Sequence, residues 1–186
     1  LGFDTAINTA MQAIDKIRDT ANSHNRLFLV EVMGRDAGCI AMFSGIASGA
    51  EAILIPESTT DESSLMELLE KGWNRQKSSC IVVIAEGDEA GGAFSIGKKI
   101  QEKFPSYDTR ITVLGHIQRG GSTTCLDRVL AARLGAHAVE ALLNGKSGEM
   151  AGLVNQQVCF TPFSKAVKQQ QLINPQLMKL VEILSV

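Results

Sequence analysis

The chain has 186 residues and a formal net charge of −2; 45% of its residues are hydrophobic and 20% are charged. This apolar content can fill a real core, and the length suits one large domain or one and a half. The charge provides no basic surface for nucleic acid and no apolar run is long enough to cross a bilayer, so we expect neither nucleic acid nor membrane as a partner.

Hydrophobic periodicity predicts alternating helices and strands. The strand at residues 80–85 is a continuous apolar run, as expected for a strand covered on both faces. Thr59 and Glu62 have capping-box spacing ahead of a helix. The alternation predicts an α/β fold, a parallel-sheet three-layer sandwich. In chain order we expect helix 3–20, strand 27–33, helix 37–50, strand 52–55, helix 59–73, strand 80–85, helix 93–103, strand 110–114, helix 124–143, strand 152–160 and helix 175–184.

The cysteines are scattered, with no C-x-x-C pair and no histidine in a metal-binding spacing; they are Cys39, Cys80, Cys125 and Cys159. This pattern is typical of reduced, mostly buried thiols in a cytoplasmic protein, and we expect no metal site. Because no charged-then-apolar stretch opens the sequence, we expect no secretory leader. A doubly wound fold rarely begins on a helix, which favours a chain that is a piece of a longer protein.

Polar side chains follow three of the predicted strands. Arg35 lies just beyond the first strand, Glu86 beyond the third, and His116 and Arg119 beyond the fourth. Because parallel strands share one carboxyl edge, we expect these ends to meet. Arginine can bind phosphate through two hydrogen bonds, histidine adds a donor, and a carboxylate accepts from hydroxyl groups. The pattern therefore predicts a site for a phosphorylated polyol.

Each of these residues also has a purely structural interpretation. Arg35 could cap a helix, His116 could be a hydrogen-bonded core histidine, and Glu86 could belong to a solvated acidic turn. A shared ligand explains all the placements better than coincidence does. Asp36 is expected to cap the following helix rather than to act as a base. On spacing alone, the other basic residues near element ends are expected to be solvated; they are Arg18, Arg26, Lys71, Arg75, Lys77 and Arg110.

Several segments together resemble 6-phosphofructokinase of the bacterial type. The resemblance covers nearly the whole chain, and its G-H-I-Q-R-G-G-S block is highly specific. The segments follow the family's order and spacing: 30–35 (VEVMGR), 49–51 (GAE), 55–57 (IPE), Glu86 and 114–122 (LGHIQRGGS), with 17–20 (IRDT) and 127–128 (DR) fitting as well.

The resemblance implies a fructose 6-phosphate site. Arg35, the expected catalytic residue, would face the transferring phosphoryl group. Glu86 would hold sugar hydroxyls, while His116 and Arg119 would bind the 6-phosphate. The residues implied to bind the substrate within one subunit are Met33, Gly34, Arg35, Glu86, His116 and Arg119.

The resemblance also implies an allosteric homo-oligomer, expected to be a tetramer. Arg26 and Arg110 would reach into a neighbouring subunit's substrate site, so that each site is shared. The implied effector residues are Arg18, Gly49, Ala50, Glu51, Arg75 and Lys77.

The family's N-terminal half, with its glycine-rich ATP loop and catalytic aspartate, has no counterpart here, and the sequence contains neither a P-loop motif nor a dinucleotide fingerprint. The resemblance therefore implies a C-terminal portion. Residues 1–115 would form the fructose 6-phosphate-binding lobe, 116–167 would return to the nucleotide-binding lobe, and 168–186 would form a C-terminal helix returning to the substrate lobe. ATP and Mg²⁺ would be bound mainly by the missing half.

The implied reaction of the intact enzyme is a glycolytic step. It transfers the γ-phosphoryl group of ATP to the 1-hydroxyl of fructose 6-phosphate and gives fructose 1,6-bisphosphate. We expect the portion alone to be inactive. A pyrophosphate-dependent phosphofructokinase and a non-catalytic sugar-phosphate-binding domain remain open alternatives.

Overall fold

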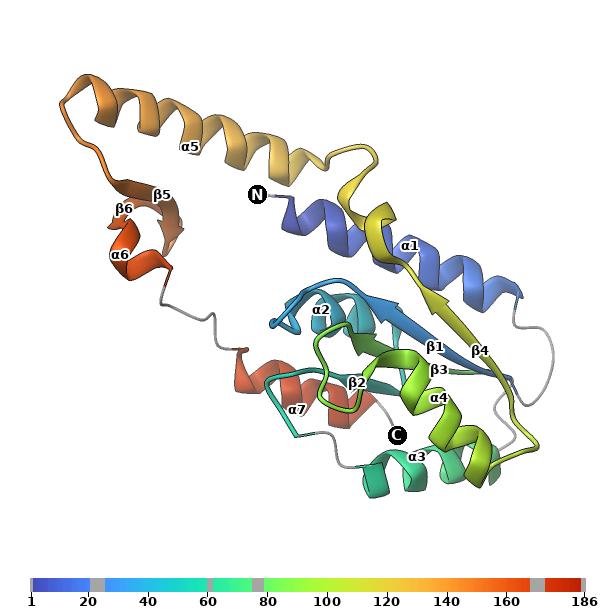
Figure 1. The fold of residues 1–186 in the computed structure, drawn as a ribbon. Helices are drawn as coiled ribbons and strands as arrows, with labels where there is room; N and C mark the ends of the chain where they lie inside the picture. The colour runs from blue at the N-terminus through green and yellow to red at the C-terminus, as the bar shows by residue number, and fades with distance from the viewer. Residues whose placement is uncertain (1, 21–25, 60–61, 75–78, 168–172, 185–186) are drawn as a thin grey trace. The chain divides into compact units, whose positions relative to one another are not determined.

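The computed structural model describes residues 2–20, 26–59, 62–74, 79–167 and 173–184, in which helices and strands alternate (Figure 1). In chain order the elements are α1 (Phe3–Thr20), β1 (Arg26–Val32), α2 (Cys39–Ser48), β2 (Ala52–Leu54), α3 (Glu62–Asn74), β3 (Ser79–Ala85), α4 (Gly92–Lys103), β4 (Asp108–Val113), the 3-10 turn η1 (Gly115–Arg119), α5 (Cys125–Leu143), β5 (Glu149–Val154), β6 (Gln157–Pro162), α6 (Phe163–Ala166) and α7 (Pro175–Leu184).

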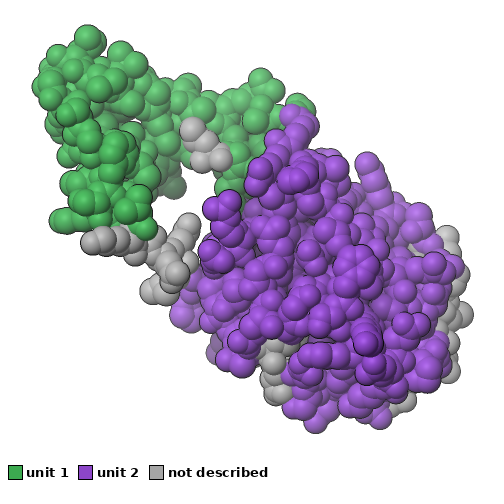
Figure 2. Space-filling model, viewed as in Figure 1, with its two compact units in different colours: residues 1–5, 122–171 green, residues 6–121, 172–186 purple. Residues whose placement is uncertain are grey.

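The chain divides into two compact units, coloured separately in Figure 2. The sheet unit comprises residues 6–121 and 172–186, and the hairpin unit comprises residues 1–5 and 122–171. The predicted boundaries, 116 and 168, lie close to 122 and 172, but residues 1–5 were not expected to group with the later segment. The assignment of these parts to a substrate lobe and a nucleotide lobe stays a prediction.

The sheet unit is built on four parallel strands in the order β2-β3-β1-β4. Val32 of β1 pairs with Ala85 of β3, and Glu31 of β1 pairs with Val113 of β4. The neighbouring strands β3, β1 and β4 therefore end at nearly the same position along the sheet. The predicted α/β class and parallel sheet are confirmed.

Alternate residues of the strands pack on opposite faces of the sheet, as strand geometry requires. On one face, Val30 and Val83 lie in a core with α1, α2 and, at its margin, α7. On the other face, Leu29 and Val82 lie in a core with α3 and α4. Both layers of helices are needed because all four of these side chains are fully buried. The predicted three-layer sandwich is confirmed.

Most predicted elements are confirmed to within three residues, and one is wrong. The strand expected at residues 152–160 is instead the antiparallel hairpin β5–β6. Asn155 and Gln156 form its turn with φ of 49° and 65°, because a two-residue hairpin turn with the right twist uses left-handed residues. The proposed capping box falls partly on residues 60–61, which lie outside the described residues.

The N-terminus of α2 also differs from expectation. Gly38, and not Asp36, is its N-cap residue, and Gly38 makes no side-chain cap. Its N–H donates instead to the Glu57 carboxylate, at 2.8 Å to Oε1 and 3.0 Å to Oε2. Glu57 comes from the chain beyond β2, so spacing near Asp36 could not reveal it.

The four cysteines are free thiols, but only Cys80 is buried and Cys125 is exposed. The expectation of mostly buried thiols is wrong. Within the described ranges, no helix is both long and apolar enough to cross a bilayer. The same ranges contain no group of three or more His, Cys, Asp or Glu side chains placed to hold a metal ion.

The hairpin unit contains a polar network at the first turns of α1 and α5. The buried Asp127 carboxylate accepts hydrogen bonds from Gly2 N–H (2.8 Å), Thr5 N–H (2.8 Å) and the Thr5 hydroxyl (2.6 Å). Thr124 N–H donates to Thr5 Oγ1 at 3.2 Å, and Asp127 N–H donates to Thr124 Oγ1 at 3.3 Å. Each helix thus supplies caps for the other. The hydrogen bonds from Thr5 hold the pKa of Asp127 below its ordinary value.

We expect Asp127→Asn to destabilise the chain, because an amide replaces a charged acceptor of three hydrogen bonds. The loss should be on the order of 1.5–3 kcal/mol in urea unfolding at pH 7. Since the folded-state pKa is lowered, this stabilisation is present above the unfolded-state pKa and is lost as pH falls through the folded-state pKa. The free energies of unfolding of Asp127→Asn and of the unsubstituted chain should therefore become equal in acid. Asp15→Asn, on an exposed position of α1, is the matched control; equal stability of the two variants at pH 7 would contradict this account.

Candidate functional site

A cavity of about 250 Å³ lies at the carboxyl edge of the sheet. Segments that follow β1, β3 and β4 all contribute to it, as the polar strand ends predicted. Every lining residue belongs to the sheet unit: Ala6, Met33, Gly34, Arg35, Ile40, Glu86, Gln118 and Arg119.

The loop after β1 carries three of these residues, Met33, Gly34 and Arg35. Arg35 has φ of 53°, a left-handed conformation that a residue with a side chain rarely adopts. The carboxylate of Glu86 supports it, because Oε1 accepts from Arg35 N–H at 2.7 Å and from Gly34 N–H at 3.3 Å. Position 87, next to Glu86, must be glycine, since a Cβ there would lie 1.9 Å from the Arg35 carbonyl oxygen. The end of β3 therefore holds the β1 loop in shape.

Glu86 is exposed and lines the cavity, so its carboxylate can reach a ligand as well as the loop. The two hydrogen bonds to the loop both use Oε1. Oε2 has no hydrogen bond to the described residues and can accept one from a hydroxyl group. Sequence reasoning predicted the contact with a ligand and missed the contact with the loop.

Arg35 and Arg119 bring two guanidinium groups to the same cavity. Both side chains are exposed, as groups that bind a soluble anion must be. His116 lies on the turn η1 with Arg119 but is not among the lining residues. Because His116 is exposed, the alternative of a core histidine is wrong. The arrangement can bind an anion through arginine and a hydroxyl group through Glu86.

Arg26 and Arg110 lie away from this cavity. Arg26 is the first residue of β1, roughly 23 Å of extended chain from Met33 at about 3.3 Å per residue. Both arginines contact Asp108 at the start of β4: Arg26 Nε lies 3.4 Å from Oδ2 and Arg110 Nε 2.9 Å from Oδ1. Neither arginine lines the cavity of its own chain.

The predicted effector residues are partly described. Arg18 Nη2 donates to the carbonyl oxygens of Ser48 and of Gly49, the latter at 3.3 Å. Gly49 is left-handed at φ of 62° and ends α2, while Ala50 beside it is buried. Glu51 Oε2 accepts from Ile81 N–H at 2.6 Å. Arg18 and the Gly49 corner are thus neighbours, whereas Arg75 and Lys77 lie outside the described residues.

Gln118 is the lining residue that sequence reasoning missed. Its Oε1 accepts from Met33 N–H at 3.0 Å, and the residue is 3% exposed. The sequence predicted no 3-10 turn after β4. When that turn is not predicted, nothing about a glutamine between isoleucine and arginine indicates that its side chain is buried.

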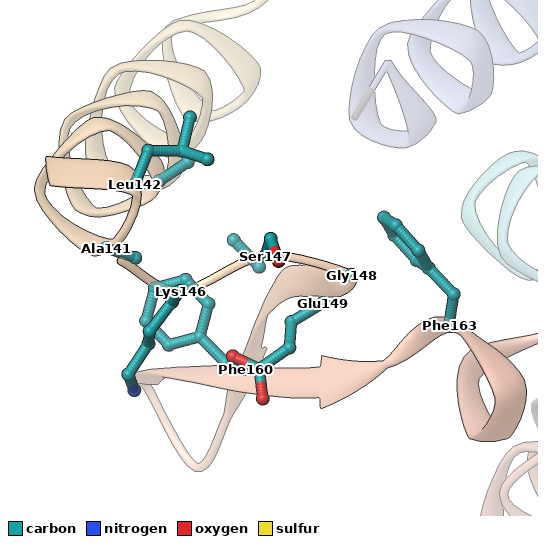
Figure 3. A pocket seen from close by; sticks show the side chains of 10 residues that line it. Ala141, Leu142, Lys146, Ser147, Gly148, Glu149, Phe160 and Phe163 are labelled. Atoms are coloured by element: carbon teal, nitrogen blue, oxygen red, sulfur yellow. The ribbon is translucent and has the colours of Figure 1, made fainter. Parts of the chain in front are cut away.

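The hairpin unit has a second cavity of about 300 Å³, shown in Figure 3. Residues from the end of α5, from β5 and β6 and from α6 surround it, including Phe160 and Phe163. Lys146 Nζ lies 5.0 Å from the Phe160 ring centroid. Among the described residues of this unit no hydrophobic side chain is buried, and Leu143 is 82% exposed. The unit therefore presents apolar surface without a core of its own.

A parallel sheet with arginines and a carboxylate at its carboxyl edge defines an α/β domain suited to a phosphorylated ligand. Residues 1–142 match the profile of the phosphofructokinase family, and the chain belongs to that family. The expectation drawn from the sequence motifs is confirmed.

Two curated relatives are ATP-dependent 6-phosphofructokinases. One, numbered 2 in Bacteroides thetaiotaomicron, is 47% identical over 186 residues, and one, numbered 1 in Thermus thermophilus, is 52% identical over 185 residues. Each alignment covers 100% of this chain and 57% of the relative, so the chain spans little more than half of their length.

Solved structures agree with this assignment. Phosphofructokinase from Saccharomyces cerevisiae has 33% identity and a TM-score of 0.79, covering 96% of this chain and 24% of that one. A pyrophosphate-dependent phosphofructokinase from Marinobacter aquaeolei, 23% identical with a TM-score of 0.77, covers 97% of this chain and 54% of that one. The second shows the shared fold alone.

Proposed function

We propose that this chain is the substrate-binding portion of an ATP-dependent 6-phosphofructokinase acting on fructose 6-phosphate. The observation that carries the proposal is the cavity, where Arg35, Arg119 and Glu86 meet from three strand ends. The names of the relatives at 47% and 52% identity support the choice of ATP over pyrophosphate as donor.

Each side chain has a role in the proposed reaction. Arg119, with His116 on the same turn, binds the 6-phosphate, and Glu86 Oε2 accepts from a sugar hydroxyl. Arg35 faces the transferring phosphoryl group and offsets its negative charge. Phosphoryl transfer depends mainly on such positioning and charge stabilisation. The left-handed backbone of Arg35, held by Glu86, keeps that guanidinium at the cavity.

MgATP supplies the phosphoryl group in this proposal. The described residues include no cluster of carboxylates placed to hold Mg²⁺, so we assign the metal and most of the nucleotide site to the part of the relatives that this chain does not cover. The hairpin unit, with its exposed apolar residues, is proposed to return to that nucleotide-binding lobe. α7, which packs on the sheet unit, is proposed to complete the substrate lobe.

The intact protein is proposed to be a cytoplasmic, glycolytic homotetramer with effector control. The free thiols support the compartment. The absence of Arg26 and Arg110 from the lining of their own chain's cavity supports substrate sites shared between subunits. Arg18 beside Gly49, with Ala50 and Glu51 following, supports an effector site, to which the proposal adds Arg75 and Lys77.

Glu86→Gln tests the substrate site. We expect fructose 6-phosphate to bind roughly tenfold to hundredfold more weakly, because the hydroxyl contact loses a charged acceptor. The amide oxygen can still accept from Gly34 and Arg35 N–H, so the loop should survive. Glu89→Gln, in the exposed loop beyond, is the control. Equal dissociation constants of the two variants in calorimetric titration would count against Glu86 as a ligand residue.

A further inference from the structure

The loop between β1 and α2, residues 33–38, brings Arg35 to the cavity. Its middle is a tight turn, closed by the hydrogen bond from Ala37 N–H to the Gly34 carbonyl oxygen at 3.0 Å. Arg35 lies within that turn at φ of 53°. A residue with a side chain keeps a left-handed backbone only where the surrounding structure holds it there. The place of the Arg35 guanidinium therefore depends on what holds the two ends of this turn.

Two carboxylates hold the turn, one at each end. At the first end, Glu86 Oε1 accepts from the N–H groups of Gly34 and Arg35. At the second end, both oxygens of Glu57 accept from Gly38 N–H, at 2.8 Å and 3.0 Å. Glu86 follows β3 and Glu57 follows β2, so these hydrogen bonds join the carboxyl ends of three strands around one loop.

The contact between Glu57 and the loop is a close one. A Cβ at Gly38 would lie 2.6 Å from Oε2 of Glu57 and 2.5 Å from Cβ of Ile55, so only glycine lets the carboxylate approach the backbone here. A negative charge is also favourable at this place, because it faces the N-terminus of α2. Glu57 does not line the cavity, whereas Ile40 in the first turn of α2 does. Any effect of Glu57 on a ligand must therefore act through the loop and this first turn.

We propose that Glu57 is a positioning residue, which through Gly38 keeps the turn in the conformation that presents the Arg35 guanidinium to the transferred phosphoryl group. The inference rests on the proposed function. Glu86 fixes only the first end of the turn. When the second end is released, the backbone of Arg35 can relax to the right-handed region that such residues prefer, and the guanidinium moves away from the cavity.

Glu57→Asp tests this role, because it keeps the charge and withdraws the carboxylate from Gly38 N–H by one methylene. Glu57 is exposed, so the fold should survive the change. The probe is fructose 1,6-bisphosphate, whose 1-phosphate is the group that Arg35 faces in the proposed reaction. In calorimetric titrations of the 186-residue chain it should bind about three- to tenfold more weakly. Glu102→Asp, at an exposed position of α4, is the matched control and should bind normally.

Glu57→Gln is the conservative variant that should restore binding. It keeps the length of the side chain and an oxygen that can accept from Gly38 N–H. Its affinity for fructose 1,6-bisphosphate should therefore lie within about twofold of that of the unsubstituted chain.

The decisive measurement repeats Glu57→Asp in a chain that already carries Arg35→Ala. The affinity should then change by less than about twofold, because the group that Glu57 positions is gone. An equal loss in both backgrounds would mean that Glu57 only stabilises the fold, and no loss in either would mean that its contact with Gly38 is irrelevant to binding. Both results overturn the inference and leave the proposed function intact.

The unsubstituted chain separates the inference from the function on which it rests. If it binds neither fructose 1,6-bisphosphate nor fructose 6-phosphate, the proposed function is wrong. Binding of fructose 6-phosphate alone would show that Arg35 does not face the transferred phosphoryl group, and would overturn the inference only.

Discussion

The 186-residue chain is expected to show no phosphoryl transfer at any concentration of fructose 6-phosphate, with either MgATP or pyrophosphate as donor. Phosphoryl transfer requires a metal-bound donor, an oriented nucleophile and a charge clamp together. The cavity offers the clamp through Arg35 and Arg119. The sequence has no P-loop motif, and the described residues offer no metal-binding cluster. We therefore expect turnover to be absent altogether.

The measurement is a coupled assay for fructose 1,6-bisphosphate on the purified chain. A matched relative of full length, such as the Thermus thermophilus enzyme, provides the positive control under the same conditions. Asp36 follows Arg35 directly and is exposed, so it is the residue to test as an unrecognised base. Turnover above background that disappears in Asp36→Asn would show that the chain carries its own catalytic apparatus.

Fructose 6-phosphate is expected to bind at full strength only to an assembled oligomer. Arg26 begins β1 and Arg110 lies in β4 opposite Phe28, and neither lines the cavity of its own chain. Each charge-assisted contact with phosphate should contribute about 1.5–3 kcal/mol, so losing both weakens binding by roughly two to four orders of magnitude. Titrations over a range of protein concentrations, with sedimentation at each, check this. Full-strength binding by a demonstrable monomer would contradict a shared site.

Mixing two defective variants gives a sharper test of the shared site. Arg110→Ala leaves the cavity of its own chain intact, while Glu86→Gln leaves Arg110 available to a neighbour. In a mixed oligomer, some cavities then combine an intact Glu86 with an intact Arg110. Binding should return on mixing, although each variant alone binds weakly. A mixture of Glu86→Gln and Arg35→Ala is the control. Arg35 and Glu86 line the same cavity of one chain, so every cavity in this mixture keeps one of the two defects and binding should not return.

Much of this architecture follows from simple patterns in the sequence. The apolar run at residues 80–85 required cover on both faces, and both layers of helices are present. Parallel strands share an edge, so Arg35, Glu86 and Arg119 could be expected to meet, and they line one cavity. The helix layers and the meeting of these side chains could be predicted because both depend on hydrophobic periodicity and strand direction. Residues close together in the sequence determine these two properties.

Two of the features that sequence reasoning missed depend on contacts between distant segments, and the third is a local turn. Gln118 is buried because a 3-10 turn directs it toward Met33, 85 residues earlier. Glu57 holds the start of α2 from beyond β2, in place of Asp36. The hairpin turn at Asn155 and Gln156 lacks the glycine that usually marks such turns. None of these contacts leaves a local pattern in the sequence.

The hydrogen bonds between Thr5 and Asp127 also bear on the order of folding. The two residues are separated by 122 positions, so the first turn of α1 has no access to this cap until the start of α5 has been synthesised. Closing so long a loop is entropically costly and slow compared with forming a helix. The first turn of α1 therefore stays uncapped long after it has been made, and its end remains frayed until the start of α5 has also been synthesised.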